Sequence, residues 1–216
     1  MQFFLDTADI NAIKKYAPWG VIDGITTNPS LIAKEGASLE QRIKEIAEII
    51  DGPISSEVVA TDVFGMLEQA RTYITWHKNV YVKLPMTEAG VKACSILSRE
   101  GVKINMTLVF SVSQALLAAK AGATLVSPFI GRLDDISEDG VALVRDMVTV
   151  FKNYSLKTKI LAASIRHPRH VVEVAKAGAD IATIPVEVFE KLVAHPLTDK
   201  GLSVFLADWE KVKNKQ

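Results

Sequence analysis

The chain has 216 residues, of which 49% are hydrophobic and 23% are charged, a composition that indicates one globular domain and excludes a disordered or fibrous protein. Its 25 basic and 25 acidic side chains cancel, so neither nucleic-acid binding nor a basic partner is indicated. Any site for an anion must therefore be local.

Short apolar segments rich in β-branched residues alternate with longer amphipathic segments, which is the pattern of repeated strand and helix units. Helical periods lie between the strands, as at Ile43, Ile46 and Ile50. The units predict an α/β protein, a single (β/α)8 TIM barrel over residues 1–216, because an open doubly wound sheet usually has fewer strands. The predicted strands span residues 3–7, 24–28, 54–59, 80–84, 103–109, 124–130, 159–165 and 181–185.

Local signals mark where some helices begin and end. Ser38 and Ser111 each precede a glutamine by three residues, which is the spacing of a capping box at a helix start. Gly122 and Gly178 each follow an Ala-Lys-Ala segment, and both are expected to end helices in the left-handed conformation.

An additional C-terminal helix is predicted at residues 201–213, beyond the eighth strand and helix unit. No barrel strand needs this helix as a cover, so it either folds back on its own barrel or packs on a neighbouring subunit. Its apolar stripe consists of Leu202, Phe205, Leu206, Trp209 and Val212.

Polar residues stand near the carboxyl ends of seven predicted strands, where the active sites of TIM barrels lie. The eighth strand, which ends in Ile184-Pro185, contributes none. Convergence on one pocket explains such a set more simply than chance does. In chain order the set is Asp6, Thr26, Asn28, Glu57, Lys83, Asn105, Thr107, Ser127, Ser164 and Arg166.

Lys83 is the central residue of this set, because it alone among the lysines lies inside an apolar strand, between Val82 and Leu84. Poor hydration would favour its neutral amine, the form that attacks a ketone to give an imine. The alternative is a structural lysine whose charged end reaches solvent. Asp6 and Glu57 supply carboxylates that could move protons, or could instead form a structural ion pair with Lys83.

Two further groups of side chains suit a sugar phosphate. Arg132 and Arg166 follow the sixth and seventh strands, where TIM barrels often bind phosphate beside a helix start, although either could be a surface residue. Hydroxyl and amide groups at strand ends suit recognition of sugar hydroxyls, although single residues of this kind often serve as turn or cap residues. They are Thr26, Asn28, Asn105, Thr107 and Ser127.

No metal or cofactor is predicted. His167 and His170 are three residues apart, but no acidic or cysteine residue nearby completes a metal-binding pattern. There is no GxGxxG motif after a strand and no P-loop, so dinucleotide and triphosphate chemistry lack support.

The sequence also predicts a cytoplasmic protein. Its one cysteine, Cys94, excludes an intrachain disulfide and has the spacing of a buried helix residue. Residues 1–6 lack the basic start of a signal peptide. The longest uncharged run, residues 104–119, contains too many polar residues for a membrane span.

Six segments together resemble the transaldolase family, in its short-chain branch that also includes fructose-6-phosphate aldolase. They are Phe4-Leu-Asp-Thr-Ala8, Gly24-Ile-Thr-Thr-Asn-Pro-Ser30, Val82-Lys-Leu-Pro85, Ile104-Asn-Met-Thr107, Ser127-Pro-Phe-Ile-Gly-Arg132 and Leu161-Ala-Ala-Ser-Ile-Arg166. The resemblance implies transfer of a dihydroxyacetone unit in the non-oxidative pentose phosphate pathway. The donor would be sedoheptulose 7-phosphate or fructose 6-phosphate, and the acceptor glyceraldehyde 3-phosphate or erythrose 4-phosphate.

The resemblance also implies a role for each residue. Lys83 would form the Schiff base with the ketose, and Asp6 would move the proton of the hydroxyl next to the bond that breaks. Glu57 and Thr107 would hold the water that takes part in imine formation. The hydroxyl-binding residues would be Asn28, Asn105 and Ser127, and the phosphate-binding residues would be Arg132, Ser164 and Arg166.

Four positions favour the transaldolase side of this branch, namely Phe129, Glu57, Asn105 and Arg166. The aldolases carry tyrosine where this chain has Phe129, and glutamine where it has Glu57. A phenol beside the imine could orient water and release free dihydroxyacetone, whereas the phenyl ring of Phe129 cannot. A fructose-6-phosphate aldolase is the main alternative, and an inactive sugar-phosphate-binding or scaffold barrel is the alternative from another class.

The resemblance also bears on the terminal helix. Short-chain transaldolases are decamers of two pentameric rings in which this helix reaches a neighbour. The resemblance therefore implies a homo-oligomer, a decamer, in which residues 201–213 pack on another subunit. Interfaces between subunits are often rich in aromatic residues such as those of this helix.

Overall fold

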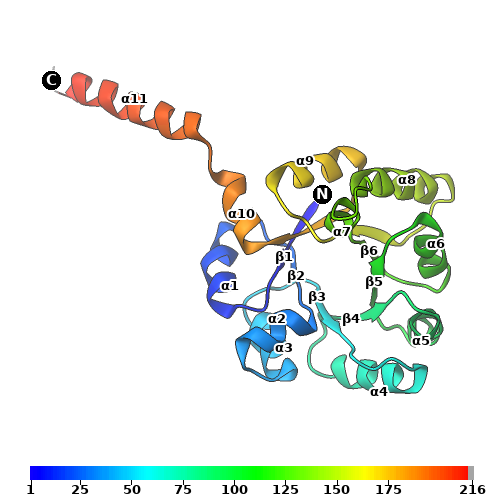
Figure 1. The fold of residues 1–216 in the computed structure, drawn as a ribbon. Helices are drawn as coiled ribbons and strands as arrows, with labels where there is room; N and C mark the ends of the chain where they lie inside the picture. Colours follow the sequence, from blue (N-terminus) through cyan, green and yellow to red (C-terminus); the bar gives the residue numbers. More distant parts are fainter. Residues whose placement is uncertain (214–216) are drawn as a thin grey trace.

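The computed structural model of the protein describes residues 1–213, so the last three residues of the predicted 1–216 domain, 214–216, lie outside the described residues. The strands of the described part are β1 Gln2–Asp6, β2 Gly24–Thr26, β3 Ile54–Glu57, β4 Val80–Pro85, β5 Ile104–Val109, β6 Leu125–Pro128, β7 Lys159–Ala162 and β8 Ile181–Pro185. All pair in parallel and in sequence order, and β8 pairs with β1 to close a barrel. The predicted (β/α)8 barrel is therefore confirmed (Figure 1).

Several strands end before the residue that the apolar pattern predicts. β2 ends at Thr26 rather than at residue 28, and β7 ends at Ala162 rather than at residue 165. The reason is local, because the chain turns into the next helix as it leaves the barrel. Asn28 already caps α2 Pro29–Glu35, and its Oδ1 accepts the Leu31 backbone N–H at 3.0 Å. Residues beyond these strand ends therefore form loops around the barrel mouth.

Helices form a ring around the barrel, and the first residue of each is commonly preceded by a capping side chain (Figure 1). The predicted caps are confirmed, since Ser38 and Ser111 each accept a backbone N–H at 3.2 Å, from Gln41 and Gln114. The remaining helices of residues 1–213 are α1 Ile10–Tyr16, η1 Ala17–Trp19, α3 Leu39–Ala47, α4 Val63–Tyr73, α5 Glu88–Arg99, α6 Val112–Lys120, α7 Ile130–Asp134, α8 Gly140–Asn153, α9 Pro168–Ala177, α10 Val186–Val193 and α11 Pro196–Lys213.

Gly122 and Gly178 have the predicted left-handed conformation, each with φ +93°. Gly178 is the C-cap of α9, and its backbone N–H bonds to the carbonyls of Ala175 and Val174. The chain can therefore reverse sharply before β8, which a side chain at this position would oppose.

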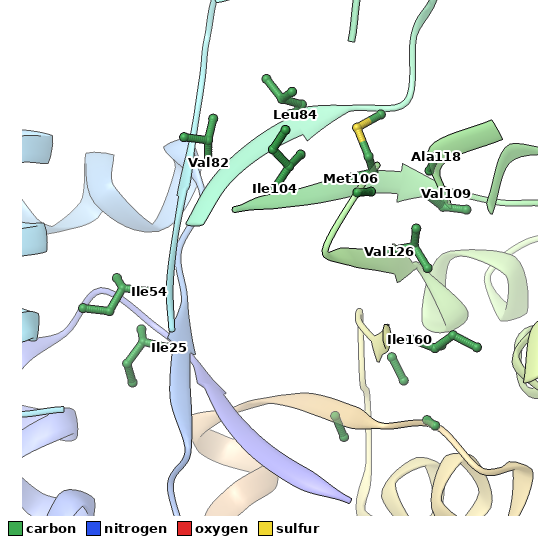
Figure 2. Close-up of a cluster of buried hydrophobic side chains, with 14 of the residues drawn as sticks. Ile25, Ile54, Val82, Leu84, Ile104, Met106, Val109, Ala118, Val126 and Ile160 are labelled. Carbon is green, nitrogen blue, oxygen red and sulfur yellow. The ribbon is translucent and has the colours of Figure 1, made fainter. Parts of the chain in front are cut away.

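Alternate residues of each strand build two apolar regions. The larger one lies between the strands and the helices, and Figure 2 shows its side chains on the outer side of the strands, among them Ile25, Val82 and Ile104. The smaller one fills the inside of the barrel with Phe4, Leu125, Leu161, Ala163 and Ile181. Several positions that continue the inward-facing set toward the carboxyl ends are polar, among them Asp6, Ser127 and Thr183, so the barrel interior becomes more polar along its axis.

The C-terminal helix is longer than predicted, because α11 begins at Pro196 rather than at residue 201. Figure 1 shows it leading away from the barrel beyond α10. None of its residues is buried, and Phe205 and Trp209 are 74% and 57% exposed. The alternative that this helix folds back on its own barrel is therefore wrong. None of the helices in the described part of the chain is long and apolar enough to cross a membrane.

Candidate active site

A cavity of about 230 Å³ opens at the carboxyl ends of the strands, where the barrel interior becomes polar. Most of the residues predicted from strand ends lie around it, together with Phe129 and Arg132. Glu57 and Thr107 are not part of its wall. Its lining consists of Asp6, Thr26, Asn28, Lys83, Asn105, Ser127, Phe129, Arg132, Leu161, Ala163, Ser164, Ile165, Arg166, Thr183 and Pro185.

Lys83 projects into this cavity from β4, and its side chain is 7% exposed. Its Nζ lies 3.0 Å from Oε2 of Glu57 and donates to the carbonyl oxygen of Thr27 at 3.2 Å. The pairing of β3 with β4 places Glu57 directly beside Lys83, so the two side chains point inward together. Glu57 therefore contacts the amine of Lys83 although it does not line the cavity itself. Glu57 and Lys83 thus form the ion pair that the sequence offered as an alternative, and in this ion pair the amine still faces the cavity.

Asp6 ends β1 and faces the same cavity. Its Oδ1 accepts a hydrogen bond of 2.6 Å from the hydroxyl of Thr26, which stands next to it in β2. Burial raises the pKa of the Asp6 carboxyl above its ordinary value, while the Lys83 ammonium and the hydrogen bond from Thr26 oppose that rise. A carboxyl group whose pKa is raised accepts a proton more readily than an ordinary one, and it can return that proton in a later step.

Thr183 was missed by the sequence argument, which found no polar contribution from the eighth strand. Its hydroxyl is 2.6 Å from that of Thr26, and it lines the cavity. Thr183 precedes the end of the strand, Ile184-Pro185, where the sequence pattern predicts functional residues. The inward alternation of Ile181, Thr183 and Pro185 was the signal that would have identified it.

A second chain of hydrogen bonds crosses the cavity floor. The Ser127 hydroxyl donates to Oδ1 of Asn105 at 2.6 Å, and Nδ2 of Asn105 donates to the hydroxyl of Ser55 at 3.1 Å. These bonds hold the Asn105 side chain between two hydroxyl groups. Ser55 also escaped prediction because it lies inside β3, two residues before Glu57 on the same inward face.

Thr107 lies near the end of β5 and is fully buried. Its hydroxyl has no hydrogen-bond partner among residues 1–213. The next residue, Leu108, has φ +59°, and the register between β5 and β6 shifts there. An irregularity of this kind changes the direction in which neighbouring side chains point. A strained backbone of this type is found preferentially at functional sites.

The cavity rim is formed by residues that follow β6 and β7. The guanidinium of Arg132 lies over the ring of Phe129, 5.6 Å from its centre. Arg166 forms an ion pair with Asp135 at 3.0 Å, and its side chain is 51% exposed. Ser164 has φ +59°, which a serine adopts only with support from its surroundings. Two positive side chains and a hydroxyl therefore lie on one side of the cavity mouth.

His167, His170 and Cys94, which the sequence does not predict to bind a metal or to form a disulfide, lie outside the cavity. Among residues 1–213, no three or more His, Cys, Asp or Glu side chains gather closely enough to hold a metal ion. Cys94 is buried, and burial raises the pKa of its thiol to about 12, so it is not a reactive thiolate.

Comparison with known proteins shows the family of this chain. The family model described as Transaldolase/Fructose-6-phosphate aldolase matches residues 3–216. The chain belongs to this family. A relative from Caldicellulosiruptor saccharolyticus, named probable transaldolase, is 58% identical over 216 residues, which are all of both chains. A relative of the same name from Kosmotoga olearia is 60% identical over 213 residues, covering 99% of this chain and 98% of the relative. Family membership and these names support an enzyme of the transaldolase type.

A solved structure with a low sequence identity shares the fold. Thiamine phosphate pyrophosphorylase from Pyrococcus furiosus superposes with a TM-score of 0.60 at 15% identity, covering 88% of this chain and 93% of the other. At this identity the likeness concerns the barrel alone.

Proposed function

We propose that this member of the family is a transaldolase that moves a dihydroxyacetone unit between sugar phosphates through a Schiff base on Lys83. The donor is sedoheptulose 7-phosphate or fructose 6-phosphate, and the acceptor is glyceraldehyde 3-phosphate or erythrose 4-phosphate. The observation that carries the proposal is the buried amine of Lys83 at the cavity, with the carboxylate of Glu57 at 3.0 Å and Asp6 in the same wall. No cofactor is required for this chemistry, and the reaction belongs to the non-oxidative pentose phosphate pathway.

The first half of the reaction forms and uses the imine. The Lys83 nitrogen adds to the ketone carbon of the donor, and the carbonyl oxygen leaves as water, so a C=N bond replaces the C=O bond. Glu57 is placed to exchange protons with the amine and, with the unpartnered hydroxyl of Thr107, to hold the water. Asp6 then takes the proton of the hydroxyl next to the bond that breaks. The aldehyde half leaves, and its bonding electrons stay on the fragment attached to Lys83.

The second half runs these steps in reverse with a new aldehyde. The fragment on Lys83 adds to the acceptor carbonyl, Asp6 returns the proton to the new hydroxyl, and water hydrolyses the imine. Asn28, Asn105 and Ser127 bind hydroxyls of the dihydroxyacetone unit. The hydrogen bonds that fix Asn105 support this assignment, since they orient its amide before the substrate arrives.

Phosphate binds on the rim, at Arg132, Ser164 and Arg166. Their grouping on one side of the cavity mouth supports this part of the proposal. Arg166 is held by Asp135, so a substrate phosphate would compete with that carboxylate for the guanidinium. Thr26 contributes indirectly, since its hydroxyl is committed to Asp6.

Transaldolase is preferred over fructose-6-phosphate aldolase because of Phe129. Its ring lines the cavity and presents no hydroxyl that could direct water to the imine. The intermediate would then persist until an acceptor arrives. Transfer to erythrose 4-phosphate, measured beside release of free dihydroxyacetone, separates the two activities. An inactive binding or scaffold barrel would show neither.

The decisive experiment is reduction with borohydride in the presence of fructose 6-phosphate, followed by peptide mass mapping. We expect one reduced adduct, on the peptide that contains Lys83, and no adduct in Lys83→Arg. Lys103→Arg is a matched control, because Lys103 lies just before β5 on the exposed surface. An adduct on another lysine, or none with active enzyme, would overturn the mechanism. Activity should also survive treatment with a chelator.

We also propose that the enzyme is a cytoplasmic homo-oligomer, a decamer of two pentamers, in which residues 201–213 pack on a neighbouring subunit. The exposed stripe on α11 supports this arrangement, since an aromatic-rich apolar surface of that kind normally meets a partner. The cytoplasmic location remains a prediction from the sequence.

A further inference from the structure

His170 is a buried side chain that the proposed mechanism does not use. It lies in the first turn of α9 and is 4% exposed, outside the cavity. Its ring nevertheless contacts the two segments that carry the rim. Nδ1 accepts the backbone N–H of Arg166 at 3.3 Å, and Nε2 lies 2.8 Å from Oδ2 of Asp134, the last residue of α7. It therefore joins the loop after β7 to the helix after β6.

These two contacts determine where the ring carries its proton. A nitrogen that accepts a hydrogen bond has no proton, so Nδ1 is bare, and Nε2 carries the proton that it donates to Asp134. The neutral ring satisfies both contacts, whereas a doubly protonated ring could not accept the Arg166 N–H. The charged and titratable groups that face the ring are His167, Asp134 and Glu173. Burial lowers the pKa of His170 and His167 acts in the same direction, while Asp134 and Glu173 oppose them.

Asp134 is itself held in place. Its Oδ1 accepts the backbone N–H of Gly140, at the start of α8, at 3.1 Å. The carboxylate therefore ties α7 and α8 to the histidine on α9. A side chain with both oxygens committed in this way is a fixed point against which the ring can be oriented.

The loop that His170 holds needs such support. Ser164 has φ +59°. Two backbone hydrogen bonds join this loop to α7: the Ile130 N–H donates to the Ala163 carbonyl at 3.0 Å, and the Gly131 N–H donates to the Ser164 carbonyl at 3.1 Å. The bond from the Arg166 N–H to His170 continues this series on the far side of Ser164. Together these bonds support a conformation that serine would otherwise avoid.

The backbone position of this loop also directs the Arg166 side chain. That side chain crosses Gly131 so closely that a Cβ there would come within 2.7 Å of Cγ and Nε of Arg166. It then reaches Asp135, so its path is fixed at both ends. A small shift of the Arg166 backbone would therefore move its guanidinium relative to the cavity.

We propose that His170, oriented by Asp134, is a positioning residue that holds the loop from Ser164 to Arg166 in the conformation that binds the substrate phosphate. This inference rests on the proposed function, because it takes the rim as the phosphate site. His170 does not touch the substrate. It acts through the backbone N–H of Arg166, so its loss should weaken phosphate binding much more than it slows the chemical steps.

The test measures inorganic phosphate as a competitive inhibitor, and KM and kcat for fructose 6-phosphate with erythrose 4-phosphate as acceptor. His170→Leu removes both contacts and should raise the phosphate inhibition constant and KM by about fivefold to tenfold, the effect of one lost hydrogen bond. The kcat at saturation should change far less. His170→Asn places an amide oxygen near the position of Nδ1, so it should restore most of the phosphate affinity.

Two further variants separate positioning from folding. Asp134→Ala should weaken phosphate binding less than His170→Leu does, and it should fold, because the Asp134 side chain is 37% exposed. Val174→Ala is the matched control, since it removes buried packing from the same helix, one turn after His170. It should lower thermal stability and leave phosphate inhibition unchanged.

The outcomes distinguish this inference from the proposed function. If Arg166→Ala weakens phosphate inhibition and neither His170→Leu nor Asp134→Ala does, the positioning role is wrong and the phosphate site stands. If Val174→Ala weakens phosphate inhibition as strongly as His170→Leu, the effect is general loosening of α9 and the role is again wrong. If phosphate does not inhibit the unchanged enzyme and Arg166→Ala has no effect, the proposed rim site is wrong and the inference fails with it.

Discussion

The hydroxyl oxygen of Thr183 lies 2.6 Å from that of Thr26, whose own proton is directed to the carboxylate of Asp6. Because the Thr26 hydroxyl has one proton and donates it to Asp6, Thr183 must donate to Thr26. The three residues come from β8, β2 and β1, and they form a chain that ends on the proposed proton-transfer group. This arrangement restrains Asp6 without occupying both of its oxygens.

Thr183→Val keeps the shape of the side chain and removes the donor. The Thr26 hydroxyl would still donate to Asp6, but it would no longer accept a hydrogen bond from Thr183, so Asp6 would be held less firmly. We expect kcat to fall about threefold to tenfold, the effect of one hydrogen bond, with little change in KM. Steady-state kinetics will measure this, with Thr183→Ser as the control that retains the hydroxyl. Unchanged kcat in the valine variant would show that the chain does not support catalysis.

Asp6→Asn keeps the size of the side chain but cannot accept the proton needed to break the carbon–carbon bond. The kcat should fall by about 100-fold or more, since general acid–base groups usually contribute ~10²–10⁴. Imine formation should persist, and borohydride trapping of Lys83 in this variant will measure it. Near-normal turnover would remove Asp6 from the mechanism.

The same substitution should change how stability depends on pH. Burial raises the pKa of Asp6 in the folded protein above its ordinary value of 3.8. At a pH between 3.8 and this raised pKa, the folded protein therefore binds the proton more readily than the unfolded chain does. The stability of the unchanged enzyme therefore falls as pH rises from 3.8 through the folded pKa. Asn does not ionise, so the variant lacks this loss of stability. The difference in melting temperature, Asp6→Asn minus unchanged enzyme, should therefore be more positive at pH 7 than at pH 4. An equal difference at both values would contradict the assigned direction of the shift.

Phe129→Tyr tests why transfer is preferred over release. A phenol at this position could place water against the imine, so release of free dihydroxyacetone should rise relative to transfer to erythrose 4-phosphate. A coupled assay for dihydroxyacetone, run with and without acceptor, will measure the ratio. Phe129→Leu is the control for loss of the aromatic ring without a hydroxyl. If the ratio rises equally in both variants, the water argument is wrong.

Removal of α11 tests the proposed assembly. A chain that ends at His195 lacks the whole helix and its exposed stripe. It should give smaller species than the full chain by light scattering, because the stripe no longer joins subunits. The double substitution Phe205→Asp and Trp209→Asp should act in the same direction while the helix remains. A truncated protein that stays fully assembled, or a full-length monomer, would show that the helix does not link subunits.

Local patterns were sufficient to predict the barrel and much of its cavity wall. The strands follow from β-branched apolar runs, and the caps at Ser38 and Ser111 follow from their spacing to Gln41 and Gln114. Lys83 is conspicuous in sequence because a charged residue inside an apolar strand is unusual. All of these features depend on residues within a few positions of one another, so the linear chain contains them.

Contacts between distant strands and loops could not be predicted in this way. Thr26 and Thr183 are 157 residues apart, and they meet because the closing pair, β8 with β1, adopts a particular register. A shift of that register by one residue would turn Thr183 away from the cavity. Register in a closed barrel depends on all the strands together, so no single segment specifies it.

The amino-acid sequence by itself determined the fold class, the inward-facing lysine and the apolar stripe of the last helix. The tertiary structure decided which side chains meet: Glu57 beside Lys83, Thr183 behind Thr26, and His170 between Arg166 and Asp134. It also decided that α11 leaves the barrel instead of covering it. Periodicity tells which face of an element a residue occupies, but the neighbour of that face depends on how all the elements pack around one barrel.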